Sequence, residues 1–252
     1  MVRGMLRSRL GLALALTVLV GVGLGRSRSA EASNKYLEIP SVNEALASPA
    51  NHYANLTNEQ TLVELNNRRI PYKRATAPQA GVRLPVRLTG PLHGVWIHSV
   101  LPEEERATTP FEILDGRLAL ALDDFARILE RHDIVEVIHF TIYRPSKTPV
   151  RKDEPGLFRH PGGLAIDVGA LKKRSGHWLA VGPHWPSQIG AKTCGQGGRS
   201  MQARRGQELI SIVCEASDQR VFHYMLTPHF DQAHADHLHL EIKPGVKWFL
   251  VN

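Results

Sequence analysis

The strongest periodic pattern of apolar and polar positions in the chain lies in residues 117–132. Charged residues occupy one side of this stretch, and four apolar residues recur on the other: Leu118, Leu122, Phe125 and Leu129. Asp115 stands just before the pattern, where an aspartate can accept hydrogen bonds from the free N–H groups of a first helical turn. The pattern therefore predicts an amphipathic helix over residues 117–132 with Asp115 as its N-cap.

Shorter apolar runs predict strands around this helix. Residues 135–143 are rich in β-branched and aromatic side chains, which is typical of a buried strand. Three further strands are expected at residues 95–97, 164–168 and 237–242. Helices and strands do not alternate regularly, which favours an α+β fold over a doubly wound parallel sheet.

The remaining segments carry weaker signals. Residues 33–90 are polar with scattered prolines, and only a short helix at residues 58–67 is expected among them. We interpret residues 33–90 as an N-terminal extension that wraps the main domain or links it to something else. Residues 172–206 are dense in glycine, proline, lysine and arginine and are expected to form a long loop, followed by a helix at residues 207–213. The main domain is thus predicted to span residues 91–252.

Residues 1–32 have the composition of a secretory signal peptide. Three arginines precede an uncharged apolar run at residues 10–24, and Ala30-Glu31-Ala32 offers the small residues that a signal peptidase recognises. The apolar run is shorter than the roughly 20 residues that a membrane-spanning helix needs. We therefore predict an exported protein, periplasmic or secreted, without a transmembrane anchor after cleavage. An uncleaved signal anchor is the alternative.

Charge and cysteine content narrow the function classes. The full chain has a formal net charge of +7, but five of its 31 basic residues and one of its 24 acidic residues fall in residues 1–32, which leaves a net charge of +3. No dense stripe of lysine and arginine remains, so nucleic-acid binding has little support. Cys194 and Cys214 are most simply explained as one structural disulfide in an oxidising compartment, with two free thiols or a role in metal binding as alternatives.

Two short stretches carry candidate chemistry: RHPGGLAID at residues 159–167 and HADHLHLE at residues 234–241. Zinc favours imidazole and carboxylate ligands, and a catalytic zinc site uses three protein ligands and leaves a fourth position for water. His160, Asp167 and one histidine of the second stretch would supply such a set. The alternative is a cluster of surface histidines with a buried Asp–His hydrogen bond.

Strand geometry predicts how the second stretch is oriented. Because side chains at i and i+2 share one face of a strand, His237, His239 and Glu241 are expected to point one way. Leu238 and Leu240 are then expected to point into the core. The glycine pair in the first stretch allows a tight turn between its histidine and the strand that contains its aspartate.

The pattern HxxGxAxD, followed about seventy residues later by HxH, resembles the LAS-type zinc peptidases. This group includes D-alanyl-D-alanine carboxypeptidases, VanX-like dipeptidases and the MepA murein endopeptidase. Residues 114–241 resemble more closely the extensin-like C-terminal domain proteins of bacteria, through the segments LDGRLALALDDFARIL, IHFTIYR and AHADHLHLEI. The resemblance covers about half of the chain. It implies a small antiparallel sheet flanked by helices, with zinc on one face.

The resemblance also implies roles for individual residues. His160, Asp167 and His239 match the zinc ligands. Arg144 matches an arginine that pairs with the substrate and stabilises developing negative charge. His237 matches a residue that hydrogen-bonds the substrate or the reacting oxygen.

His234 departs from the pattern of many members, which carry a glutamate there as general base. The murein endopeptidase branch also has a histidine at this place, and an imidazole can accept a proton near neutral pH. His234 or His237 would then take the proton of a zinc-activated water, although His234 is alternatively only a loop residue. Asp236 and Glu241 are candidates to orient the ligand imidazoles. Alternatively, Asp236 is a solvated residue of a turn and Glu241 is a charge on the face of the sheet.

These expectations combine into one functional hypothesis. We expect an exported zinc-dependent peptidase or amidase that hydrolyses amide bonds, with peptidoglycan peptides as the substrate class that the resemblance implies. The alternative is a wall-binding or structural module that keeps the fold without turnover. Three protein ligands would favour an enzyme, and a fourth would favour the module. Trp178 and Trp185 either line a groove for a glycan or are simply packed.

Overall fold

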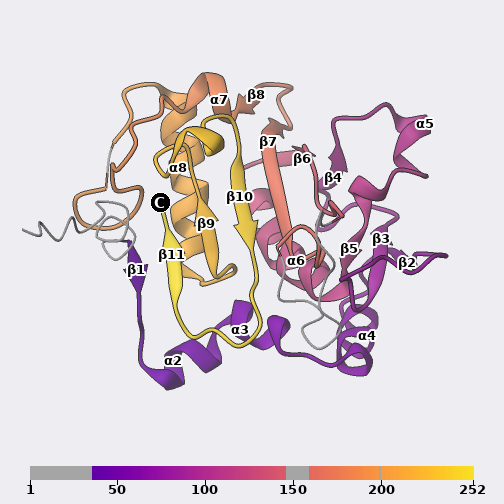
Figure 1. The fold of residues 1–252 in the computed structure, drawn as a ribbon. Helices are drawn as coiled ribbons and strands as arrows, with labels where there is room; N and C mark the ends of the chain where they lie inside the picture. The colour runs from indigo at the N-terminus through magenta and orange to yellow at the C-terminus, as the bar shows by residue number, and fades with distance from the viewer. Residues whose placement is uncertain (1–35, 146–158, 199) are drawn as a thin grey trace, which may run out of the picture.

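A computed structural model describes residues 36–145, 159–198 and 200–252, and the predicted signal peptide, residues 1–32, lies outside the described residues. Helices and strands are mixed along the chain, in agreement with the predicted α+β class (Figure 1). The helices are α2 (Val42–Ala47), α3 (Pro49–Ala54), α4 (Asn58–Asn67), α5 (Glu103–Arg106), α6 (Gly116–Arg131), α7 (Val181–His184) and α8 (Arg204–Asp218), with two 3-10 helices, η1 (Pro110–Glu112) and η2 (Gln232–His234).

An eight-stranded sheet forms the centre of the molecule, with strand order β1-β11-β9-β10-β7-β6-β4 and β8 paired to β7. Its strands are β1 (Leu37–Glu38), β4 (Trp96–Ser99), β6 (Ile134–His139), β7 (Ala165–Lys173), β8 (Trp178–Ala180), β9 (Tyr224–Leu226), β10 (Leu238–Glu241) and β11 (Phe249–Val251). The pairs β4–β6 and β9–β11 are parallel. The expected small antiparallel sheet is therefore wrong in size, and its pairing is mixed, because the other neighbouring strands are antiparallel. Helix α6 lies in the connection from β4 to β6, and such a crossover allows these two strands to be parallel.

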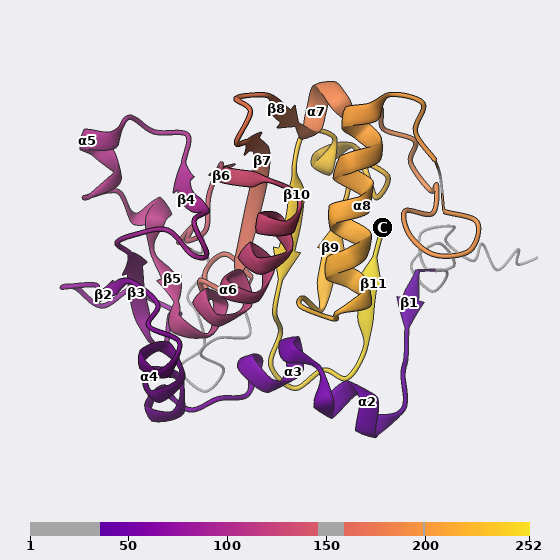
Figure 2. The same ribbon diagram turned by 180° about the vertical axis from the view of Figure 1, so that it is seen from behind.

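The helices α6 and α8 cover one face of this sheet, as the view from behind shows (Figure 2). We call it the helix-covered face and the opposite one the outer face. A second, three-stranded sheet of β2 (Tyr72–Arg74), β3 (Pro85–Leu88) and β5 (Leu114–Asp115) lies beyond β4 (Figure 1). No helix in the described part of the chain has the length and apolar character needed to span a membrane.

Helix α6 lies within one residue of its predicted bounds, and Asp115 is its N-cap, with a side chain that accepts a hydrogen bond from the N–H of Arg117. Asp115 also accepts from Nε of Arg117 at 2.8 Å, and both side chains are buried. Leu118, Leu122 and the other residues of the predicted apolar face belong to the main hydrophobic core. The amphipathic pattern therefore identified both the helix and the face that packs against the sheet.

Residues 36–90 pack on the main domain. Helix α4 has the bounds that the sequence predicts. Ala50 and Tyr53 of α3 and Leu65 of α4 belong to the same hydrophobic core as α6. The hydroxyl of Tyr53 donates to a carboxylate oxygen of Asp124 on α6 at 2.5 Å. The part of the predicted N-terminal extension that the structure describes therefore packs on the main domain.

Two predicted strands have different bounds in the structure. The strand expected at residues 135–143 is assigned only to His139; Phe140 and Thr141 still bond the backbone of Asp167, and the chain then turns away, with the N–H of Ile142 donating to the carbonyl of Phe111. The strand expected at residues 164–168 continues to Lys173 as β7. This longer β7 carries the pairing with both β6 and β8.

The long loop expected at residues 172–206 is wrong in its first half. That half completes β7 and forms β8 and α7, and Trp185 after α7 is fully buried. A strand of three residues and a helix of four are too short to produce a detectable period. The disulfide between Cys194 and Cys214 confirms the predicted pairing and ties the irregular second half to α8, which extends the predicted helix at both ends.

Candidate metal centre

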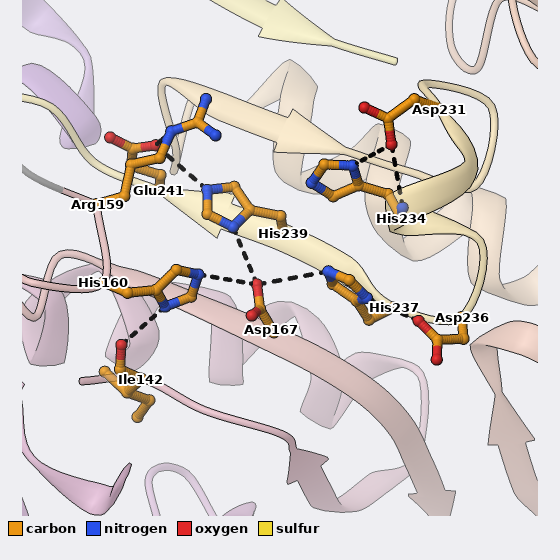
Figure 3. Close-up of polar contacts among 10 residues, drawn as sticks. All are labelled: Ile142, Arg159, His160, Asp167, Asp231, His234, Asp236, His237, His239 and Glu241. Carbon is orange, nitrogen blue, oxygen red and sulfur yellow. Dashed lines mark hydrogen bonds and ion pairs between the residues drawn. The ribbon is translucent and has the colours of Figure 1, made fainter. Parts of the chain in front are cut away.

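The candidate site lies on the outer face of the sheet, where β7 and β10 pair. Asp167 on β7 and His239 on β10 are direct partners in the antiparallel register, so their side chains emerge side by side. Leu238 and Leu240 are buried in the core, as the alternation of the strand predicts. Figure 3 shows the resulting cluster of histidines and carboxylates.

His160 approaches Asp167 from the turn before β7. Gly163 in this turn has a φ of +64°, and a Cβ there would lie 2.8 Å from the backbone nitrogen of Asp115, so the turn requires glycine. Nδ1 of His160 donates a hydrogen bond to the carbonyl of Ile142 at 2.8 Å. Its Nε2 therefore remains free to face Oδ1 of Asp167, at 3.2 Å.

His239 is held between two carboxylates. Its Nδ1 lies 3.0 Å from Oδ1 of Asp167, and its Nε2 lies 3.2 Å from Oε2 of Glu241. The same oxygen of Glu241 pairs with Nε of Arg159 at 3.0 Å. Burial lowers the pKa of the His239 imidazole, but the hydrogen bonds and charges of Asp167 and Glu241 outweigh this effect and raise the pKa. Glu241 is thus placed to orient His239, as the sequence suggested.

Three buried donors form the centre of the cluster. The cluster offers three possible ligand atoms that lie within 4.8 Å of one another, one each from His160, Asp167 and His239. Among the residues that the structure describes, no other set of three such metal-ligating side chains is found. Burial raises the pKa of Asp167, but the hydrogen bonds and charges of the two imidazoles outweigh it and hold the pKa well below its ordinary value. Two imidazoles with their other nitrogens already bonded, and one ionised carboxylate, fit the ligand chemistry of zinc.

His237 lies beside this set without joining it. Its Nε2 is 3.7 Å from Oδ1 of Asp167, and its Nδ1 donates to Oδ1 of Asp236 at 2.8 Å. The ring of Phe140 packs edge-on against the His237 ring, with centroids 5.9 Å apart. The hydrogen bond to Asp236 therefore orients the His237 ring. His237 itself is not one of the three residues of the cluster.

His234 approaches the cluster from η2. Its Nδ1 lies 2.6 Å from Oδ1 of Asp231, and its ring centroid lies 5.2 Å from that of His237 and 5.9 Å from that of His239. Burial lowers the pKa of His234 more strongly than the hydrogen bond and charge of Asp231 raise it. The result is a neutral, oriented imidazole whose Nε2 is not used by Asp231 (Figure 3).

Some residues of the site were not identified from the sequence. Asp231 and Arg159 hold His234 and Glu241, and the carbonyl of Ile142 holds His160. Asp231 has a weak local signal, because it is the N-cap of η2 three residues before His234.

Arg144, the expected substrate-binding arginine, lies close to the cluster through its backbone. Its N–H donates to the carbonyl of His160 at 3.3 Å, and its side chain is exposed. The structure therefore brings Arg144 to the rim of the site. Its role stays a prediction.

The fold and site together define an α+β protein with a candidate metal centre on the outer face of its sheet. The family model described as the extensin-like protein C-terminus matches residues 118–249, and the chain belongs to this family. The match includes all three residues of the cluster, His160, Asp167 and His239. No curated protein and no solved structure matches the chain. The resemblance to LAS-type zinc peptidases stays a prediction.

Proposed function

We propose that this chain is an exported zinc-dependent hydrolase that cleaves amide bonds in peptidoglycan peptides. The observation that carries the proposal is the buried cluster of His160, Asp167 and His239, in which each imidazole has its second nitrogen bonded to a carbonyl or a carboxylate. This pre-arranged donor set is typical of zinc sites. When bound, zinc supplies a Lewis acid that polarises a carbonyl group and lowers the pKa of water.

The number of donors favours turnover over a structural role. Among the described residues the close cluster has three donor residues, and His234 and His237 lie outside it. A structural zinc site is typically closed by four protein ligands, whereas a catalytic site has three and leaves a position for water. The geometry therefore supports the enzyme rather than the wall-binding module.

We assign His234 as the general base. Asp231 accepts the hydrogen bond of its Nδ1–H, so Nε2 carries the lone pair. Nε2 takes a proton from water as the water oxygen bonds to the amide carbon, and returns the proton to the amine nitrogen as the C–N bond breaks. The products are a carboxylic acid and an amine, and His234 regains its starting state.

His237 and Arg144 complete the proposed machinery. Asp236 accepts from Nδ1 of His237, which leaves its Nε2 to hydrogen-bond the substrate or the reacting oxygen. The exposed guanidinium of Arg144 at the rim would stabilise the negative charge that develops on the carbonyl oxygen.

The substrate class rests on the resemblance to the LAS-type peptidases and on the predicted export. Peptidoglycan lies outside the cytoplasm, and the disulfide between Cys194 and Cys214 is compatible with an oxidising compartment. The predicted signal peptide and the disulfide support the proposal of a periplasmic or secreted location. The sequence patterns that carry the resemblance include all three donors of the cluster.

The proposal is tested by the release of new amines from purified peptidoglycan. Residues 33–252 are incubated with zinc, with and without a chelator, beside a His160→Ala/His239→Ala double variant. Chelator-sensitive release by the native chain and none by the variant is the expected result. Stoichiometric zinc without release from peptidoglycan contradicts the proposed reaction and favours the wall-binding module.

A further inference from the structure

We infer that the outer face of the sheet, from the metal centre to its far end, is a binding surface for a neutral polysaccharide chain built of N-acetylated sugars. The surface centres on four residues that are paired in register across β4, β6, β7 and β8: Trp96, Glu136, Lys172 and Trp178. We call these four the cross-strand row. Two exposed tryptophans thus bracket a carboxylate and an ammonium group on one sheet face.

The alternation of the strands assigns the row to the outer face. Leu171 and Leu179, next to members of the row, are buried in the core, so Lys172 and Trp178 point the opposite way. Val137 is likewise buried next to Glu136. The helices α6 and α8 cover only the other face (Figures 1 and 2).

A register shift keeps the metal centre on the same face as the row. The pairing of β6 with β7 slips between Ile138 and His139, so that Gly169 is an extra residue on β7. A Cβ on Gly169 would lie 2.6 Å from the ring of Phe140, which shows that this ring lies directly on the strand. Because of this bulge, Asp167 points to the outer face. Without it, the alternation of side chains along β7 would have turned Asp167 towards the core.

Phe140 connects the two ends of the surface. Its ring contacts His237 beside the metal centre, and it is 41% exposed. From Asp167 to Lys172 the surface extends for about 17 Å along β7 at ~3.3 Å per residue. The cross-strand row spans three strand spacings, about 14 Å. Both dimensions suit an extended chain rather than a single small ligand.

The exposure of the aromatic side chains points to a ligand with flat apolar faces. Trp96 is 52% exposed and Trp178 is 36% exposed, although tryptophan is highly buried on average. By contrast, Trp185, the other tryptophan of the same region, is fully buried. An exposed indole offers a rigid apolar surface and an N–H donor, and this combination matches a sugar ring, which has apolar faces and hydroxyl groups at its edge.

The charges of the row favour a neutral chain. Lys172 donates to Glu136 at 3.1 Å, and Nε2 of His98 donates to the other oxygen of Glu136 at 3.0 Å. The ammonium group of Lys172 also lies 5.1 Å from the centre of the Trp178 ring. The carboxylate of Glu136 and the ammonium of Lys172 balance each other, so the centre of the row does not by itself select a charged chain. Their remaining donor and acceptor sites are fixed in position for hydroxyl and N-acetyl groups.

The edge of the surface is hollowed at β4. A cavity of ≈ 360 Å³ is lined by Trp96, His98 and other residues of β4, β3 and the segment around α5. Several of its side chains are polar or charged, among them Arg87 and Glu112. Arg87 is held rigidly, because its NH1 group donates to the carbonyl of Arg106 at 3.1 Å. The cavity gives the surface a concave end next to the more exposed of its two tryptophans.

This inference deepens the proposed function, because a glycan bound here would present attached peptides to the metal centre. It is tested by binding alone, so that its failure and the failure of hydrolysis are separate results. The probe is a tetramer of β-1,4-linked N-acetylglucosamine, titrated into residues 33–252 and into the His160→Ala/His239→Ala variant. Tryptophan fluorescence and calorimetry are the readouts. A free peptidoglycan stem peptide is titrated in a parallel arm.

We expect the tetramer to bind both proteins equally. Trp96→Ala and Trp178→Ala should each weaken binding about tenfold, and replacement of either residue by Phe should restore most of it. Trp248→Ala is the matched control, because Trp248 is a partly exposed tryptophan that packs on Tyr224 away from the row. Thermal melting verifies that each variant is folded.

Three results would overturn the inference. The first is no binding of the tetramer by the native chain. The second is equal weakening by Trp248→Ala. The third is binding of the stem peptide, but not of the tetramer, in a manner that depends on Trp96 and Trp178, which would assign the surface to a peptide. Absence of hydrolysis with retained tetramer binding leaves the inference standing and counts only against the proposed reaction.

Discussion

Replacement of Glu241 by glutamine tests whether the cluster around His239 is arranged for a metal. Glu241 is 1% exposed and lies 3.2 Å from Nε2 of His239 and 3.0 Å from Nε of Arg159. If Nδ1 of His239 is a zinc ligand, Glu241 fixes the tautomer and increases the basicity of the ring. Glu241→Gln keeps the shape of the side chain and removes its charge. Loss of such a partner typically costs metal affinity about 10- to 100-fold, which is about 1.4–2.8 kcal/mol.

The chain offers a closely matched control. Glu215 contacts an imidazole and an arginine in the same way, with Oε2 2.9 Å from Nε2 of His132 and Oε1 3.1 Å from Nε of Arg131. This trio lies between α6 and α8, on the helix-covered side of the sheet. Glu215→Gln should therefore leave zinc affinity unchanged. The two substitutions remove the same charge from the same kind of contact, and they differ in burial, 2% against 32% exposure of the side chain, and in distance from the metal centre.

Competition with a chromogenic zinc chelator measures the affinity of the native chain and of both variants. The expected result is a weaker zinc complex for Glu241→Gln alone. Native affinity in Glu241→Gln, or an equal loss in Glu215→Gln, would refute the assignment of His239 as a ligand oriented by Glu241. Thermal melting in the presence of a chelator separates a change in affinity from a change in folding.

Three further predictions concern the base, the disulfide and acid stability. His234→Gln should lower amine release about 10²- to 10⁴-fold with unchanged zinc content, and Asp231→Asn should cause a smaller loss; a native rate in both variants would exclude the assigned base. Cys194→Ser/Cys214→Ser should lower the free energy of unfolding by about 3 kcal/mol, because the closed loop restricts the unfolded chain; an unchanged urea midpoint would contradict this. Burial lowers the pKa of His223 to about 4 in the folded state, so the unfolded state binds more protons below the ordinary histidine pKa of about 6.5. The free energy of unfolding should therefore fall as the pH drops from about 6.5 to about 4, by up to about 1.4 kcal/mol per pH unit. His223→Gln should flatten this slope, and an equally steep slope in urea titrations would show that another group is responsible.

The two stretches that contain the metal-binding candidates could be found in the sequence, and the family resemblance selected His239 among the histidines of the second stretch. His239 and Glu241 share a strand face by simple alternation, and Gly163 allows the turn that brings His160 to β7. The helix α6 and its N-cap Asp115 were identified from a short-range pattern.

The parts that escaped prediction depend on contacts between distant segments. Helices α2 and α3 are short, and α3 is stabilised by packing of residues such as Ala50 and Tyr53 in the same core as α6, which no local pattern reveals. Strand β8 has only three residues and exists through its pairing with β7. Arg159 is joined to Glu241 across a separation of 82 residues, and only the fold brings them together.

The central claim is that His160, Asp167 and His239 hold zinc, and metal analysis of the purified chain tests it most directly. Residues 33–252 and the His160→Ala/His239→Ala variant are prepared side by side, dialysed against zinc at neutral pH and analysed by inductively coupled plasma mass spectrometry. We predict about one zinc per native chain and none in the double variant. Absence of zinc from the native chain, or equal zinc in both proteins, would contradict the account.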